Sequence, residues 1–195
     1  AWSGSIGTLE FLFKPWIQQY FGEEKMAEYI ADAAKMGVTT KGPDINSSEA
    51  DFTAKDNVIY FGLSGIKNIG IGFAEAIVEE RNQNGKYKSF ADFLKRICKV
   101  NVNKTQIYSL IGAGAFDGLN ERRSGLFHVY EELLIKLMDK KRREADGQID
   151  LFAEVEDGTD GDIVMPDISG IAELSFNQRL SLEKEMTGLY SPKSS

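Results

Sequence analysis

Apolar residues recur every three or four positions over much of this chain, which is the spacing of amphipathic helices. The longest such stretch runs from Glu121 to Glu144, with its apolar positions at Leu126, Tyr130, Leu133, Leu134, Leu137 and Met138. The same spacing, together with typical start and stop residues, predicts shorter helices at Glu23–Met36, Phe90–Ile97, Lys104–Ile111 and Ser175–Met186. The pattern therefore predicts a mainly α-helical fold.

Polar residues at the starts of two segments support these helix boundaries. Ser89 is followed three residues later by Asp92, which is the pattern of a capping box. Asn103 can cap the next helix, because its side chain can accept from a free N–H group of the first turn. Helices are therefore expected to begin just after Ser89 and Asn103.

A small β-structure is expected before the helices return at Leu63. Two short β-prone runs, Asp51–Ala54 and Val58–Phe61, flank a polar turn and predict a β-hairpin. Residues 38–49 carry turn residues without periodicity and are expected to form an ordered loop.

A glycine-containing hairpin is predicted between Leu63 and Arg81. A short helix leads into Ile69-Gly70-Ile71-Gly72, and a second helix, with Arg81 at its end, follows. This is the helix-hairpin-helix pattern. Glycine lets the backbone turn sharply and approach a phosphate without a Cβ in the way, and the free N–H groups of the second helix then point at that anion. The pattern predicts contact with the DNA backbone; the alternative is a plain tight turn between helices.

A second candidate hairpin lies between Ile107 and Asp117, where Gly112-Ala113-Gly114 follows a helix. Two hairpins of this kind often pack as a pair and hold both strands of a duplex. The alternative is that Gly112 and Gly114 only allow close packing at a helix end.

The charge of the chain is unevenly distributed. Its net charge of −7 argues against a generic DNA-binding protein, because such affinity comes mostly from Lys and Arg. Residues 62–125, however, hold ten Lys and Arg against six Asp and Glu. The candidate phosphate contacts in this part are Lys67, Lys86, Lys88, Lys104, Arg122 and Arg123. Lys140–Arg143 fit the stabilisation of a helix C-terminus, with phosphate contact as the alternative.

A short peptide in the acidic, glycine-rich stretch after Ala145 suggests a protein partner. It comprises Gln148, Ile149, Asp150, Leu151 and Phe152, and it resembles the pentapeptide that binds the bacterial sliding clamp. Leu151 and Phe152 would fill an apolar pocket while the Gln148 amide binds at its rim. The alternative is an apolar latch onto the chain's own domain.

Several stretches, taken in order, resemble the alpha subunit of bacterial DNA polymerase III. They are Glu28–Gly37, Gly42–Glu49, Ile59–Leu63, the Ile69–Gly72 hairpin, Ala113–Asp117, the Gln148–Phe152 peptide and Leu182–Tyr190. Residues 1–22 and 191–195 do not follow this pattern.

The resemblance implies the tandem helix-hairpin-helix and clamp-binding region of a replicative polymerase. Residues 1–50 would be the helical end of the fingers, 51–146 the DNA-binding domain, and 147–195 the clamp motif, acidic linker and last helix. The implied partners are duplex DNA, held by its backbone without sequence specificity, the sliding clamp and the other polymerase domains. The parent would be a cytoplasmic, Mg²⁺-dependent DNA-directed DNA polymerase, a nucleotidyltransferase of DNA replication.

The segment itself is expected to be non-catalytic and to bind no cofactor. Nucleotide addition needs paired carboxylates that hold two metal ions, and no such cluster stands out in the sequence. One cysteine and one histidine offer neither a disulfide framework nor a transition-metal site. No apolar run of about 18 residues predicts a transmembrane helix.

Two other functions fit part of the pattern. A stand-alone scaffold that binds the clamp without significant DNA affinity would suit the net charge of −7. A base-excision enzyme would use a similar hairpin, but Phe73 follows Gly72 where such enzymes have a catalytic lysine. Base-excision chemistry is therefore disfavoured.

Overall fold

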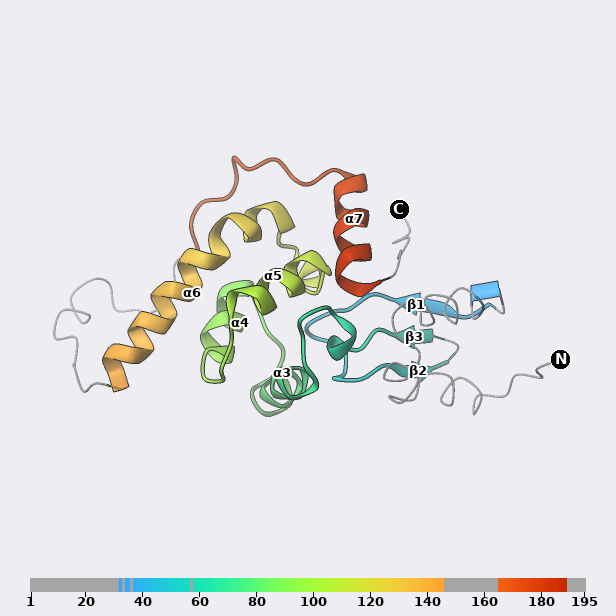
Figure 1. Ribbon diagram of the computed structural model, residues 1–195, viewed down its shortest axis with the longest axis horizontal. Coiled ribbons are helices and arrows are strands. Elements are labelled where there is room, and N and C mark those ends of the chain that lie inside the picture. The colour runs from blue at the N-terminus through green and yellow to red at the C-terminus, as the bar shows by residue number, and fades with distance from the viewer. Residues whose placement is uncertain (1–31, 33, 36, 57, 146–164, 189–195) are drawn as a thin grey trace.

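The computed structural model describes residues 32, 34, 35, 37–56, 58–145 and 165–188. A small sheet lies at one end of the molecule and the helices make up the rest (Figure 1). The helices are α3 (Ile71–Asn84), α4 (Phe90–Ile97), α5 (Lys104–Gly112), α6 (Arg123–Ala145) and α7 (Phe176–Thr187). The predicted mainly α-helical fold is confirmed. None of the helices in the described part of the chain combines the length and the apolar character of a membrane span.

The helix starts follow the capping residues. The Ser89 side chain accepts from the Asp92 N–H at the start of α4, while the Asp92 carboxylate accepts from Lys88 N–H, so the reciprocal half of the predicted box is not formed. Asn103 and Gln106 form a complete capping box on α5. Ser175 and its N3 partner do the same on α7. The predicted Glu23–Met36 helix lies mostly outside the described residues, of which 32, 34 and 35 are helical.

The sheet contains the predicted hairpin and one strand that the sequence did not predict. Strands β2 (Thr53–Lys55) and β3 (Val58–Tyr60) pair antiparallel, which confirms the hairpin. Strand β1 (Thr39–Lys41) pairs parallel with β3, in the segment expected to be a loop. The expected loop was wrong at these three residues. Thr39–Lys41 are polar and show no apolar alternation, and their partner strand β3 lies 19 positions further along the chain.

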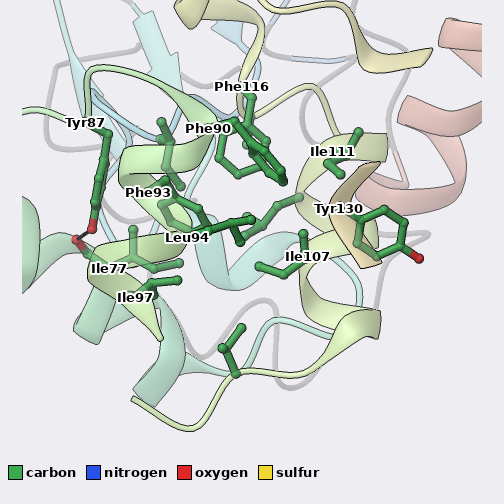
Figure 2. Close-up of a cluster of buried hydrophobic side chains, with 14 of the residues drawn as sticks. Ile77, Tyr87, Phe90, Phe93, Leu94, Ile97, Ile107, Ile111, Phe116 and Tyr130 are labelled. Carbon is green, nitrogen blue, oxygen red and sulfur yellow. Dashed lines mark hydrogen bonds between the residues drawn. The ribbon is translucent and has the colours of Figure 1, made fainter. Parts of the chain in front are cut away.

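An aromatic cluster forms the centre of the helical core (Figure 2). Phe116 packs edge-on against Phe90 and Phe93, each with ring centroids 5.0 Å apart, and Tyr87 contacts Phe93 in the same way. These edge-to-face pairs add stabilisation beyond simple area burial. The Tyr87 hydroxyl donates to the Ile77 carbonyl at 2.9 Å, and burial raises its pKa to about 12.

The same core draws on distant parts of the chain. Ile45, before the sheet's hairpin, and Met186, on the last helix, both belong to it. Cys98 is buried at the end of α4, and burial raises the pKa of its thiol. The described residues from the start, middle and end of the chain therefore share one hydrophobic core.

Candidate nucleic-acid interface

The first glycine hairpin lies between a short 3₁₀ helix, η1 (Leu63–Gly65), and α3. Gly70 is the N-cap of α3 and has φ −73° and ψ 156°, an extended conformation open to any residue. The left-handed residue is Asn68, with φ 65°. The expectation that the glycines make the turn was therefore wrong. Asn68 makes it, because asparagine tolerates this conformation better than most residues.

Gly70 and Gly72 are glycines that the fold itself does not require. A Cβ built on either one would meet no atom of the described residues within 4 Å. Both glycines are exposed, and the Ile71 side chain between them is 47% exposed. The open space therefore lies on the outside of the hairpin, where a ligand could approach the backbone closely.

The backbone at the start of α3 carries free hydrogen-bond donors. The N–H groups of Phe73 and Ala74 both donate to the Gly70 carbonyl at 3.1 Å. The N–H groups of Ile71 and Gly72 have no acceptor among the described residues. Two donors at a helix N-terminus, next to open space, can bind an anion such as phosphate.

Two neighbours hold this hairpin in place. The Asn68 side-chain amide donates to the Ser109 hydroxyl of α5 at 2.9 Å, and the Lys67 backbone N–H donates to the Met186 carbonyl of α7 at 2.8 Å. The Lys67 side chain is half exposed, with its Nζ 3.9 Å from Glu185 Oε1. Such an exposed ion pair contributes little to stability.

The second glycine hairpin is buried. Gly112, Ala113 and Gly114 all lie inside the molecule, and a Cβ on Gly112 would come within 3.0 Å of Met186 Cγ. Gly114 has φ +78°, and a Cβ there would collide with the Arg123 guanidinium. Close packing, the alternative left open by the sequence, accounts for both glycines in this arrangement. Contact of this hairpin with DNA stays a prediction.

Arg123 is buried beneath α7, with 3% of its surface exposed. Its Nε and Nη2 donate to the Asp117 carboxylate at 2.8 and 2.7 Å, and Nη2 also donates to Glu183 at 2.5 Å. Burial alone would lower the pKa of Arg123, but hydrogen bonds to these two carboxylates raise it above its ordinary value. The guanidinium is therefore fully charged and engaged with protein groups.

The four other predicted contacts are also engaged or distant. Arg122 donates to the carbonyls of residues 168, 169 and 171 at 2.8 to 3.1 Å. Lys104 Nζ lies 2.7 Å from Glu131 on α6. Lys86 and Lys88 are exposed in the loop after α3, roughly 20 Å from Gly70 along that helix. Of the six predicted cations, Lys67 lies nearest to the hairpin along the chain, three positions before Gly70.

Two arginines that were not predicted as site residues donate hydrogen bonds to backbone carbonyls elsewhere in the fold. Arg81 was expected to mark the end of the hairpin. It belongs to α3, and its buried side chain donates to the carbonyls of Ile45 and Ser48. Arg96 donates to the Gly85 carbonyl at 2.9 Å and to the Lys86 carbonyl at 3.4 Å, so it holds the loop that carries the exposed lysines. Neither role has a local sequence signal.

The described part of the chain contains no cluster of three or more His, Cys, Asp or Glu that could hold a metal ion. The Gln148–Phe152 peptide lies outside the described residues.

Comparison with known proteins agrees with this geometry. Residues 37–126 match the helix-hairpin-helix motif family. DNA polymerase III subunit alpha of Mycobacterium leprae is 39% identical over 170 residues, and that of Thermus aquaticus is 40% identical over 167 residues; each match covers 86% of the chain. The chain is homologous to one segment of the DNA polymerase III alpha subunit. It spans only 14% and 13% of the length of these two relatives.

The Deinococcus radiodurans DNA polymerase III alpha subunit extends the resemblance. It is 33% identical over 197 residues and covers 97% of the chain. The match therefore reaches into residues 1–22, which the sequence analysis had set apart from the polymerase III pattern. The predicted resemblance is confirmed. That residues 1–22 are atypical of the polymerase III pattern stays a prediction.

Proposed function

We propose that this segment grips duplex DNA by its backbone and tethers the parent polymerase to the sliding clamp, without catalysing a reaction itself. The observation that carries the DNA part is the pair of free N–H groups at Ile71 and Gly72, open to the outside between two glycines. A DNA phosphate fits this place because it accepts from both donors and is favoured by the positive end of the helix dipole.

Such a contact needs few cations, which reconciles DNA binding with the net charge of −7. The helix dipole favours an anion by about 0.3–1 kcal/mol, and Lys67, three positions before Gly70, is half exposed. Backbone donors recognise phosphate and not base sequence. The proposed contact is therefore independent of DNA sequence, as replication requires.

The clamp part of the proposal rests on the sequence of Gln148–Phe152 and on the homology to polymerase III alpha subunits. Leu151 and Phe152 are the proposed apolar anchors. A polymerase bound to a clamp that encircles DNA rebinds its primer as an intramolecular event, at high effective concentration. This coupling is the physical basis of processive synthesis by the parent chain, for which Mg²⁺ is the proposed metal ion.

A duplex-binding titration tests the DNA part. The Gly70→Val/Gly72→Val variant is expected to bind labelled duplex at least about tenfold more weakly, because the two side chains block the approach to the free N–H groups. Its unfolding temperature should stay close to that of the parent, since the space at both positions is open. Unchanged DNA affinity in a folded variant would contradict the proposed contact.

Calorimetry with purified bacterial sliding clamp tests the tether. The parent chain is expected to bind, and the Leu151→Ala/Phe152→Ala variant is expected to show no measurable heat. Val155→Ala, in the same segment but outside the pentapeptide, is the matched control and should bind like the parent. Equal binding by all three proteins would show that the pentapeptide is not the anchor.

The second candidate function is a clamp-binding scaffold with no significant DNA affinity. The net charge and the burial of Gly112–Gly114 favour it. The two functions differ in the duplex titration: a scaffold would show the same weak, salt-sensitive binding before and after the glycine substitutions.

A further inference from the structure

A second concentration of positive charge lies where the C-terminal turns of α4 and α6 meet. Its members are Lys95, Lys99, Lys140, Lys141, Arg142 and Arg143, all of them exposed. We name this set the α4–α6 basic end. The last turns of α6 extend away from the body of the molecule, at the end opposite the sheet (Figure 1).

Lys141 joins the two helix ends. Its Nζ donates to the Cys98 carbonyl at 3.0 Å and lies 3.4 Å from the Lys99 carbonyl, so it caps the C-terminus of α4 from α6. Because the last carbonyls of a helix are free acceptors, this cation stabilises α4 directly. The contact also fixes Lys99 close to the basic run of α6.

The helix dipoles account for only part of this charge, although Lys95, Arg142 and Arg143 lie in the last turns of their helices. The dipole benefit of a cation falls off within the last turn of a helix and is small at an exposed position. Lys95 lies on the last turn of α4, and Lys99 lies in the turn that follows the helix. Arg96, which lies between them, is already paired with Glu80 and Asp92. Asp139 and Glu144 flank the basic run Lys140–Arg143 of α6.

We propose that the α4–α6 basic end binds the phosphate backbone of duplex DNA, as a contact separate from the Gly70–Gly72 hairpin. Exposed Lys and Arg side chains that converge from two elements match a polyanion, and counterion release favours the complex. The proposal shares its ligand with the proposed function but uses different residues and a different physical effect. Long cationic side chains provide this contact, whereas the hairpin contact uses backbone donors.

The test measures duplex affinity against salt concentration for the whole chain. The basic-end variant is Lys99→Gln/Lys140→Gln/Arg142→Gln, which keeps the Lys141 cap intact. Its matched control is Lys35→Gln/Lys41→Gln/Lys55→Gln, which removes the same charge from exposed positions near the sheet. The basic-end variant is expected to lose about tenfold in affinity at low salt, and its log–log salt slope should shrink by about 2 to 3. The control should change the slope by less than about 1.

The outcomes separate this proposal from the hairpin function. Equal losses in the two charge variants would overturn the proposal, because they would reflect net charge alone; so would an unchanged slope in the basic-end variant. If the basic-end variant weakens DNA binding while Gly70→Val/Gly72→Val does not, the proposed DNA contact of the α4–α6 basic end is supported and the hairpin function fails. If Gly70→Val/Gly72→Val weakens binding while the basic-end variant does not, the hairpin function stands and the proposed DNA contact of the α4–α6 basic end is rejected.

Discussion

Arg123 and Glu183 are joined by a 2.5 Å hydrogen bond, although 60 positions separate them in the sequence. Both side chains are buried, and Arg123 also binds Asp117 and the Gly112 carbonyl. The bond therefore fastens α7 to the start of α6 and, through Asp117, to the turn that follows α5. Since Met186 of the same helix packs on Gly112, α7 covers the second glycine hairpin.

The Glu183→Ala variant is expected to lose about 2 kcal/mol of unfolding free energy in urea denaturation. This is less than the roughly 3–5 kcal/mol that follows removal of one partner from a buried pair, because Arg123 keeps its bonds to Asp117. Glu185→Ala is the control on the same helix: its carboxylate is 57% exposed, and its loss should stay below about 0.5 kcal/mol. Equal, small losses in both variants would show that the buried pair does not hold α7.

Gly72→Ala is expected to change stability and DNA binding in opposite directions. Alanine in the first turn of α3 should raise the unfolding free energy by about 0.5–1 kcal/mol, because glycine weakens helices and the added Cβ meets no neighbour. The same Cβ should reduce duplex affinity by keeping a phosphate away from the backbone. Gly170→Ala, also in open space but away from the hairpin, should leave DNA affinity unchanged. A Gly72→Ala variant with full affinity would argue against close backbone contact.

The sequence predicted the elements that depend on local signals. Asn103 capped α5 and the β2–β3 hairpin formed as predicted, because each depends on residues a few positions apart. The burial of Gly112 could not be predicted, because it depends on Met186, more than 70 positions later. Glycine at a helix end has the same local pattern whether DNA or another helix covers it.

The candidate site shows the same division. The Gly70–Gly72 hairpin could be found from its spacing, but the role of Asn68 in the turn could not. Arg81 lies at the end of the DNA-binding pattern in the sequence, yet it is buried. It donates to the carbonyls of Ile45 and Ser48, more than 30 positions earlier. Charge alone does not indicate whether an arginine faces solvent or the core.

Asn68 should stabilise the fold more through its left-handed backbone conformation than through its side-chain hydrogen bond. Asn68→Ala is expected to lower the unfolding free energy by about 1–2 kcal/mol, because alanine is disfavoured at φ 65°. Asn68→Gly adopts this φ readily and should lose less, although it also lacks the bond to Ser109. Ser109→Ala removes that bond alone. Thermal unfolding of the three variants, with duplex affinity measured in parallel, separates the two effects; a larger loss in Asn68→Gly than in Asn68→Ala would contradict the role of the turn.

Glu121 should destabilise the fold once it ionises. Burial raises its pKa above the ordinary value of 4.5, and the Phe90 N–H that it accepts offsets this only in part. A carboxyl group with a raised pKa in the folded state contributes stability below pH 4.5 that is lost as the pH rises through the folded pKa. Glu121→Gln keeps an oxygen for Phe90 and removes the charge, so it should raise the unfolding temperature at pH 7.

Thermal unfolding at two pH values checks this sign. The advantage of Glu121→Gln should shrink toward zero near pH 4, where the parent carboxyl is largely neutral in both states. Glu131→Gln should behave in the opposite way, because hydrogen bonds from Lys104 and Tyr130 lower the pKa of Glu131. Its ionised form stabilises the fold above pH 4.5 and loses this effect as the pH falls, so its substitution should lower the unfolding temperature at pH 7. If Glu121→Gln also lowers the unfolding temperature at pH 7, the ionised Glu121 carboxylate has a stabilising partner. The destabilisation assigned to its burial would then be wrong.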